Sequence, residues 1–474
     1  TLDLEGSSKN RRKVVLEQTG DIRDDVCDKL RDVWDALGKR KFSMIEKLVE
    51  PLLRLADLKH EKTRALSTDM YLSLFSEELK RSNNFSLIRF VTINAVDLIV
   101  TERSHFRPHV TRSSALRNVK GLDGSKTNSN SVGEERKENA PGQGFEELFD
   151  LRLRKKFQND PLLNTGETLD FLSEVKKLFS LLSVLSKFGN KGNLEYEDEQ
   201  TQAMLRLMAY LKKAQRNDMF VKYVERLKNI HRDLNNHSEA AQVLLMHATY
   251  PWQENKDVPA FVVNISATWP RESIENRRIR VFRKAIDLYA LGKNWEKCLE
   301  YCELLRTFYE REFMYEELSS ILTEQAKYYL AIKKQERFYP THFRVSFLGL
   351  AYPVDIRNKV FIYRGAPLES IMEFSSRLRH QFPTAKSVPP GKEKDEMKDS
   401  TDKLYIQVSG VTTAYSEEWD NMMPAFRDSI IDPVKEYRKN CDVDTFWFPR
   451  PFRKNRERKA QMKARGEAYN EFMD

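Results

Sequence analysis

The spacing of apolar residues changes once along this 474-residue chain, near Pro340. Before that point apolar side chains recur every three or four positions, as at Leu172 and Val175. This period is that of an amphipathic helix. After it, Phe343 and Val345 alternate with polar neighbours, as in a half-buried strand. The spacing predicts a mainly α protein: an alpha-solenoid of helical repeats followed by a smaller β-rich module.

The N-terminal part, residues 1–112, is predicted to be an armadillo- or HEAT-like helical region. Between positions 22 and 100 the apolar residues predict four helices in antiparallel pairs. The apolar face of the first of these helices is predicted to comprise Val26, Leu30, Val33 and Leu37. Such pairs bury their faces by stacking on neighbouring pairs, which is the logic of a solenoid. No strict repeat is visible in the sequence.

Residues 113–147 differ in composition, with Gly, Ser, Asn and charged residues and very few residues to bury. This composition is typical of a disordered linker. A long surface insertion within one domain is the alternative.

Helical spacing resumes over residues 148–340. Ser238 is predicted to cap the helix that follows it, and Gly292 is predicted to end a helix. The paired helices resemble tetratricopeptide packing, although the consensus of that repeat is not met.

The β-rich module is predicted to span residues 341–454. Segments rich in β-branched and aromatic residues predict strands in 343–347, 359–364, 404–411 and 445–448. Between them lie a predicted short helix, 368–382, and a charged insertion, 392–403.

The basic charge of the chain is concentrated near its C-terminus. Lys and Arg number 80 against 71 Asp and Glu, a net charge of +9. Residues 450–465 hold eight basic residues and one acidic residue, and so account for most of it. A nucleic-acid-binding protein spreads its cations over a whole face, so no nucleic-acid partner is expected. This stretch is interpreted as a solvated basic linker or helix end, with contact to anionic lipids or an acidic partner as the alternative.

No motif for covalent chemistry, metal binding or a cofactor is found. The four cysteines, Cys27, Cys298, Cys302 and Cys441, lack the paired spacing of a zinc site. His231 and His247 fall in helical patterns and are interpreted as structural. Few cysteines, no signal peptide and no long apolar run predict a cytoplasmic protein in a reducing compartment. The first residue is not Met, which suggests a piece of a larger protein.

Several segments resemble the DOCK (dedicator of cytokinesis) family of Rho-GTPase guanine nucleotide exchange factors, most closely its Rac-directed branch. They include FVKYVERLKNIHRDLNNHSEAAQVLLMHA at 220–248 and FRVSFLGLAYPVDIRNKVFIYRG at 343–365. Residues 168–182, 295–329, 380–391 and 442–454 extend the likeness to about 165–474. The chain departs from the family pattern at Ala351, where a glycine is usual, and in insertions after Lys392 and Asn455.

The resemblance implies an exchange factor for Rac-like GTPases in actin-cytoskeleton signalling, which acts without hydrolase or transferase chemistry. Residues 1–112 would end the helical-repeat region, 148–340 would be a dimerising lobe A, and 341–454 would be a GTPase-binding lobe B. Residues 455–474 would be a basic junction towards lobe C, which would follow residues 470–474. The chain is therefore expected to bind a GTPase weakly and to lack exchange activity alone. A non-catalytic helical scaffold is the alternative.

The resemblance also implies the binding residues and partners. The residues implied to contact the GTPase are Tyr352, Arg357, Asn358, Lys359, Tyr363, Asp444 and Thr445. The implied partners are a Rho-family GTPase, a second copy of the chain through lobe A, and an ELMO-type adaptor bound by regions outside this chain. Recruitment to the membrane is expected, and no cofactor.

Overall fold

The structure is a computed structural model in which the chain divides into two compact units, one ending at Val281 and one beginning at Phe282. The residues described are 9–58, 60–105, 152–159, 163, 165–186, 188, 197–253, 256–264, 267–352, 356–390, 395–415, 419, 421–441, 443–448, 452–453 and 472–473. The predicted linker 113–147 and nearly all of 450–465 lie outside them. The predicted domain boundaries stay predictions.

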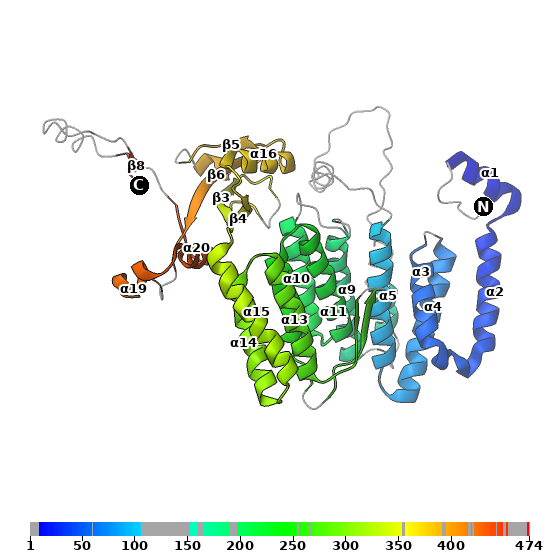
Figure 1. Ribbon diagram of the computed structural model, residues 1–474. Coiled ribbons are helices and arrows are strands. Elements are labelled where there is room, and N and C mark those ends of the chain that lie inside the picture. The colour runs from blue at the N-terminus through cyan, green and yellow to red at the C-terminus, as the bar shows by residue number, and fades with distance from the viewer. Residues whose placement is uncertain are drawn as a thin grey trace. The chain divides into compact units, whose positions relative to one another are not determined.

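The first unit is helical, as predicted (Figure 1). Its helices are α1 (Lys9–Thr19), α2 (Ile22–Leu37), the 3-10 helix η1 (Gly38–Met44), α3 (Ile45–Ala56), α4 (Glu61–Ser82), α5 (Ser86–His105), α8 (Arg154–Asn159), α9 (Gly166–Leu185), α10 (Glu197–Lys213), α11 (Asn217–Asp233) and α12 (His237–Ala248). A short hairpin of β1 (Phe261–Asn264) and β2 (Ala267–Trp269) follows α12. The four α-helices expected between residues 22 and 100 are α2 to α5.

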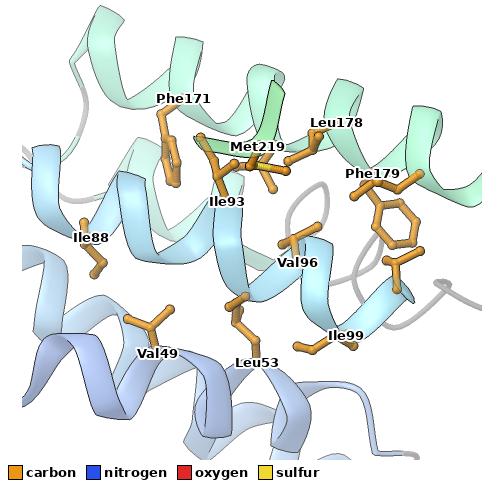
Figure 2. Packing of buried hydrophobic residues seen from close by; sticks show 14 of the residues in the cluster. Val49, Leu53, Ile88, Ile93, Val96, Ile99, Phe171, Leu178, Phe179 and Met219 are labelled. Atoms are coloured by element: carbon orange, nitrogen blue, oxygen red, sulfur yellow. The ribbon is translucent and has the colours of Figure 1, made fainter. Parts of the chain in front are cut away.

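The core of this unit is built in helical layers, shown in Figure 2. Val49 of α3 faces Ile88 of α5, and Leu53 faces Val96. The opposite side of α5 meets α9, at Phe171 and Leu178. Because α5 is apolar on two sides, it is buried between two neighbours. The solenoid-like stacking expected from the sequence is therefore present.

The apolar face predicted for α2 is half right, because Leu30 and Leu37 pack against the core. Val26 and Val33 are exposed, whereas Cys27 and Trp34 are buried. The packed side of α2 is selected by polar atoms as well as apolar ones: Trp34 Nε1 donates to Ser73 Oγ at 3.1 Å. Apolar periodicity alone favours the valines over the tryptophan and so identifies only two of the four predicted residues correctly.

Two successive sets of three helices share one turn geometry. We call α10–α12 the first helix triplet; the second helix triplet is α13 (Ile274–Leu291), α14 (Trp295–Arg311) and α15 (Tyr315–Lys334). Every turn inside the triplets has one left-handed residue, and these are Gln215, Asn235, Lys293 and Phe313. The residue after each of them donates its N–H to the carbonyl of the residue five positions before it. This bond is 2.8 to 2.9 Å long in all four turns, as in a Schellman motif.

These turns correct two predicted caps. The left-handed residue after α13 is Lys293 rather than Gly292. The position before α12 is Asn236, so Ser238 lies in the first turn of that helix instead of capping it. Both predictions rested on residue preference, which the repeated turn geometry overrides here.

The rest of the second unit is the β-rich module. Its elements are β3 (Pro340–Leu348), β4 (Val360–Pro367), α16 (Ile371–Gln381), β5 (Lys386–Ser387), α17 (Asp395–Lys398), β6 (Tyr405–Thr413), α19 (Pro424–Ser429), α20 (Asp432–Asn440) and β7 (Phe446–Trp447). The strand order is β4-β3-β6-β5, and β7 also pairs with β6. β8 (Phe452–Arg453) pairs with β9 (Phe472–Met473). The predicted switch from helices to strands near Pro340 is confirmed.

Candidate protein-binding surface

The central strand β3 divides the β-rich module into a packed face and a partly open face. The packed face is formed by alternate residues of β3 and by α16: Phe343, Val345, Phe347, Phe374, Leu378 and Phe382. The rings of Phe343 and Phe374 stack at 4.3 Å. This apolar contact holds α16 against the sheet and fixes which residues of β3 point to the other side.

The other side carries a set of residues that we call the polar sheet face. It consists of His342, Arg344 and Ser346 of β3 with their β4 partners Arg364, Ile362 and Val360. Val360 and Ile362 are 49% and 41% exposed. A cationic strand edged by exposed apolar side chains has the mixed character of a protein-binding surface.

Aromatic residues from β7 and the residue after it lie beside this face. The guanidinium carbon of Arg344 lies 4.9 Å from the ring centre of Phe448, and its Nη1 donates to Gln407 Oε1 at 3.4 Å. The ring of His342 lies 5.1 Å from that of Phe446. These contacts hold the two polar side chains of β3 in place.

Burial lowers the pKa of His342 below its ordinary value of 6.5. The side chain is therefore neutral at pH 7. Because the folded protein disfavours the protonated form, the stability that this residue contributes is present above pH 6.5 and falls as the pH drops below it. Ser346 Oγ is buried, and no partner for it occurs in the described part of the module.

Two of the predicted contact residues form the inside of the turn between β3 and β4. Tyr352 is only 1% exposed, and its hydroxyl donates to the Tyr405 carbonyl at 3.3 Å. Arg357 Nε donates to the Tyr352 carbonyl at 3.1 Å. In this structure Tyr352 is thus a core residue that supports the surface, and Arg357 stabilises the turn. Contact of either with a partner stays a prediction.

Three more predicted residues lie just before β4 or within it. Asn358 adopts a left-handed conformation, with φ of 53°, and its Oδ1 accepts from the Gly349 N–H at 3.0 Å. Lys359 is exposed, and Tyr363 is half-buried against the packed face. Asn358 is therefore explained by the turn, whereas Lys359 is accessible to a partner.

Asp444 and Thr445 lie at the opposite end of the sheet. Both are exposed, and the Thr445 carbonyl accepts from the Ala414 N–H, just after β6. The end of β6 lies beside the start of β3, whereas Lys359 lies beside its end. The structure therefore does not gather the seven predicted residues into one cluster.

The sequence did not single out Val360, Ile362 or Trp447, although all three are large, apolar and exposed. The one sequence feature that pointed to Val360 and Ile362 is that β4 has apolar residues at successive positions. A strand with one packed face should alternate with polar residues, so apolar residues on both sides indicate a second covered face.

Cys298 and Cys302 are not activated for chemistry. Burial raises the pKa of both, that of Cys302 to about 12, which keeps them as thiols. His247 is buried and pairs through Nε2 with Arg277 at 3.1 Å. Within the described ranges no cluster of His, Cys, Asp or Glu could hold a metal ion. No described helix is long and apolar enough to cross a membrane.

Comparison with known proteins gives matches along nearly the whole chain. The family model described as "Dedicator of cytokinesis (DOCK) TPR region" matches residues 1–105. Human dedicator of cytokinesis protein 3 is 25% identical over 455 residues, which cover 96% of this chain. Along nearly its whole length the chain is similar to members of the dedicator of cytokinesis family. Human dedicator of cytokinesis protein 4 is 24% identical over 454 residues.

The similarity reaches beyond animal DOCK proteins and differs in extent between relatives. DOCK-like protein 1 of Saccharomyces cerevisiae is 26% identical over 281 residues, 59% of this chain. The chain spans about a fifth of the length of human DOCK proteins 3 and 4. The family model describes its stretch as a tetratricopeptide region, where the sequence predicted armadillo- or HEAT-like repeats.

Proposed function

We propose that the chain is part of a guanine nucleotide exchange factor for Rac-like, Rho-family small GTPases in cytoskeletal signalling. The observation that carries the proposal is the similarity to DOCK protein 3 over 96% of the chain, which includes the helical region and the β-rich module alike. Exchange requires no acid, base or nucleophile. A factor that binds the nucleotide-free GTPase more tightly than the loaded form weakens nucleotide binding by the same factor.

The polar sheet face is the proposed docking surface for the GTPase. Its support is the pair of cations Arg344 and Arg364 beside the exposed Val360 and Ile362. Lys359 extends the same end of the sheet and is one of the exposed predicted contacts. Cations at a docking surface speed association and orient the partner, while apolar contacts slow dissociation.

Binding of Rac to the chain, measured in the GDP-loaded and nucleotide-free states, tests this function. We expect the nucleotide-free form to bind at least tenfold more tightly, a difference of about 1.4 kcal/mol. Arg344→Glu should weaken binding at least tenfold. Arg379→Glu is the matched control, because it reverses an exposed charge on α16, which covers the opposite side of the sheet. Equal affinity for both states would contradict an exchange function.

Release of fluorescent GDP from Rac measures the rate of nucleotide exchange, which the binding measurement does not give. Weak binding without acceleration is the outcome expected from the sequence. Clear acceleration by the chain alone would show that these 474 residues suffice for exchange and would correct that expectation. Equal binding of both nucleotide states would favour the alternative function, a non-catalytic scaffold.

We also propose that two copies of the chain associate through α15. Tyr315, Leu322 and Tyr329 follow each other at intervals of seven residues, and all three are exposed. Ala326 lies on the same side. Large apolar residues at heptad spacing, with small residues between them, form the seam of a helix pair. A second copy would cover this stripe with its own α15.

Analytical ultracentrifugation at micromolar concentration tests the association. A dimer supports the proposal, and a monomer over the whole concentration range contradicts it. The other partners remain proposals: an ELMO-type adaptor bound outside this chain, and contact of residues 450–465 with an anionic membrane. A cytoplasmic protein recruited to the membrane is the corresponding proposed location.

A further inference from the structure

Strand β4 forms the outer edge of the sheet. It pairs with β3 on one side, and the strand order gives it no second neighbour among the described residues. It is eight residues long, which is long for an edge strand left unprotected. Free strand edges pair readily with other chains, so proteins normally shorten, twist or cover them.

The register shows which main-chain groups of β4 are free. The Phe347 N–H donates to the Lys359 carbonyl at 3.0 Å, which makes 347 and 359 a hydrogen-bonded pair. In an antiparallel ladder such pairs alternate. Phe361 therefore bonds to β3, whereas the N–H and C=O groups of Val360 and Ile362 point away from it. No hydrogen bond to these four groups occurs within the described residues.

The free edge ends abruptly at Ala366. Its N–H donates to Glu369 Oε2 at 2.8 Å, and its carbonyl accepts from Thr341 Oγ1 at 3.2 Å. Pro367 then removes a donor. Neither proline nor a bulge interrupts the edge between Val360 and Ile362, and both side chains there are apolar. The main-chain groups of Val360 and Ile362 are therefore available for pairing, whereas those of Ala366 are already bonded.

The strands around the window Val360–Ile362 carry charge of one sign, and the carboxylate of Glu369 beyond its end is paired with Arg377. The strands β3, β4 and β6, with the described turn residues 356–359, hold four cations and no carboxylate: Arg344, Arg357, Lys359 and Arg364. Pairing β4 with the β4 of a second copy would bring these cations together, which is unfavourable. An acidic strand would meet opposite charge instead.

We infer that Val360–Ile362 accepts an extended, acidic segment of a partner protein as an added strand. Main-chain hydrogen bonds to Val360 and Ile362 supply the affinity, and the surrounding cations select acidic segments. This mode of binding goes beyond docking on side chains of the polar sheet face. It can be tested without a GTPase, so its failure is separate from failure of the exchange function.

The test measures fluorescence anisotropy of a labelled peptide, (Val-Glu)4, added to the full chain. The control peptide has the same side chains with alternate main-chain nitrogens methylated, which removes the donors of one edge. We expect the unmodified peptide to bind, the methylated peptide to bind at least tenfold more weakly, and binding to weaken with salt. No binding, or equal binding of both peptides, would overturn the inference.

Two variants at Ile362 separate main-chain pairing from side-chain docking. Ile362→Pro removes an outward N–H and leaves the bonds to β3 intact, so the strand should fold. We expect it to lose at least tenfold in peptide affinity. Ile362→Thr keeps the main chain and should lose less than threefold. A larger loss in the threonine variant than in the proline variant would overturn the inference.

Amide hydrogen exchange on the unaltered chain provides a measurement that needs no variant. Adding (Val-Glu)4 should slow exchange at Val360 and Ile362, whereas Phe361, already bonded to β3, should change little. Protection absent at both amides at saturating peptide contradicts strand addition. Self-association that Ile362→Pro abolishes would instead assign this edge to a second copy.

Discussion

The two helix triplets share a backbone plan and differ in their outer surfaces. Their left-handed turn residues are 78 positions apart in both cases, from Gln215 to Lys293 and from Asn235 to Phe313. At the same offset Phe220 and Cys298 are both buried, as are Leu227 and Leu305. The inner packing of each triplet therefore uses the same positions.

The outer positions show the difference. Leu244 of α12 is fully buried, whereas Leu322, its counterpart in α15, is 46% exposed. Asn235 and His237 of the first triplet correspond to the exposed Phe313 and Tyr315 of the second. The second triplet thus carries large apolar residues at positions that are not buried within this chain, so they add little to its stability. Such surfaces are typical of association sites.

Alanine at the two corresponding leucines should give the largest contrast. Leu244→Ala removes a fully buried side chain and should lower the free energy of unfolding by about 2–5 kcal/mol. Leu322→Ala removes a half-exposed one and should cost well under about 1 kcal/mol in the monomer. Urea denaturation followed by tryptophan fluorescence measures both. Similar losses would show that α15 is covered as fully as α12.

A buried polar pair gives the next largest effect. His247 lies in the first triplet, and Arg277 Nη1 bonds to its Nε2 at 3.1 Å. The counterpart of His247 at the 78-residue offset is Gln325, which donates to Glu303 at 3.4 Å. His247→Leu leaves a buried N–H without that acceptor and should cost about 1–3 kcal/mol.

His247→Gln is the matched control, since it installs the residue that the second triplet uses at this position. Its side-chain oxygen can accept from Arg277, so we expect less than half the loss of His247→Leu in the same denaturation measurement. An equal loss in both variants would mean that ring packing against Trp269, at 4.5 Å, outweighs the hydrogen bond.

Association through α15 is the third point of contrast. Tyr329 is 63% exposed on the heptad stripe, so Tyr329→Glu should weaken a dimer at least tenfold, about 1.4 kcal/mol. Thr323→Glu adds the same charge at an exposed position off the stripe and should change dimerisation less than threefold. Sedimentation velocity over a concentration series measures both. Equal effects would assign the association to another surface.

Much of this architecture was predictable because apolar periodicity reports burial directly. Helix α1 was not predicted, and the hairpin β1–β2 lies in a stretch predicted to be helical. The other α-helices of the first unit except α8, and the strands β3, β4, β6 and β7, follow from spacing alone. The face of α2 did not, because Trp34 is held partly by its Nε1 hydrogen bond to Ser73. The 78-residue correspondence was also missed, since it is preserved in turn geometry and burial while residue identities changed, as from Phe220 to Cys298.

The candidate surface was less predictable than the fold. The resemblance selected Lys359, and this residue is exposed in the structure. It also selected Tyr352 and Asn358, whose environments are explained by the core and the turn. Exposure of Val360 and Ile362 depends on which strand lies at the edge, and strand order comes from long-range pairing that local patterns do not encode.

The turn residue Phe313 provides the smallest and most local test of the comparison. It is 73% exposed and left-handed, with φ of 54°. This conformation costs about 1–2 kcal/mol for most residues and less for asparagine, which the first triplet uses at Asn235. Phe313→Asn should therefore stabilise the monomer by up to about 1 kcal/mol, and Asn235→Phe should destabilise it by a similar amount. Denaturation of both variants at a concentration below that of dimerisation measures the effect. If Phe313→Asn instead lowers stability, the ring contributes packing within the chain that outweighs the backbone cost. If it raises monomer stability while weakening association, the strained turn is retained because the second triplet presents this ring to a partner.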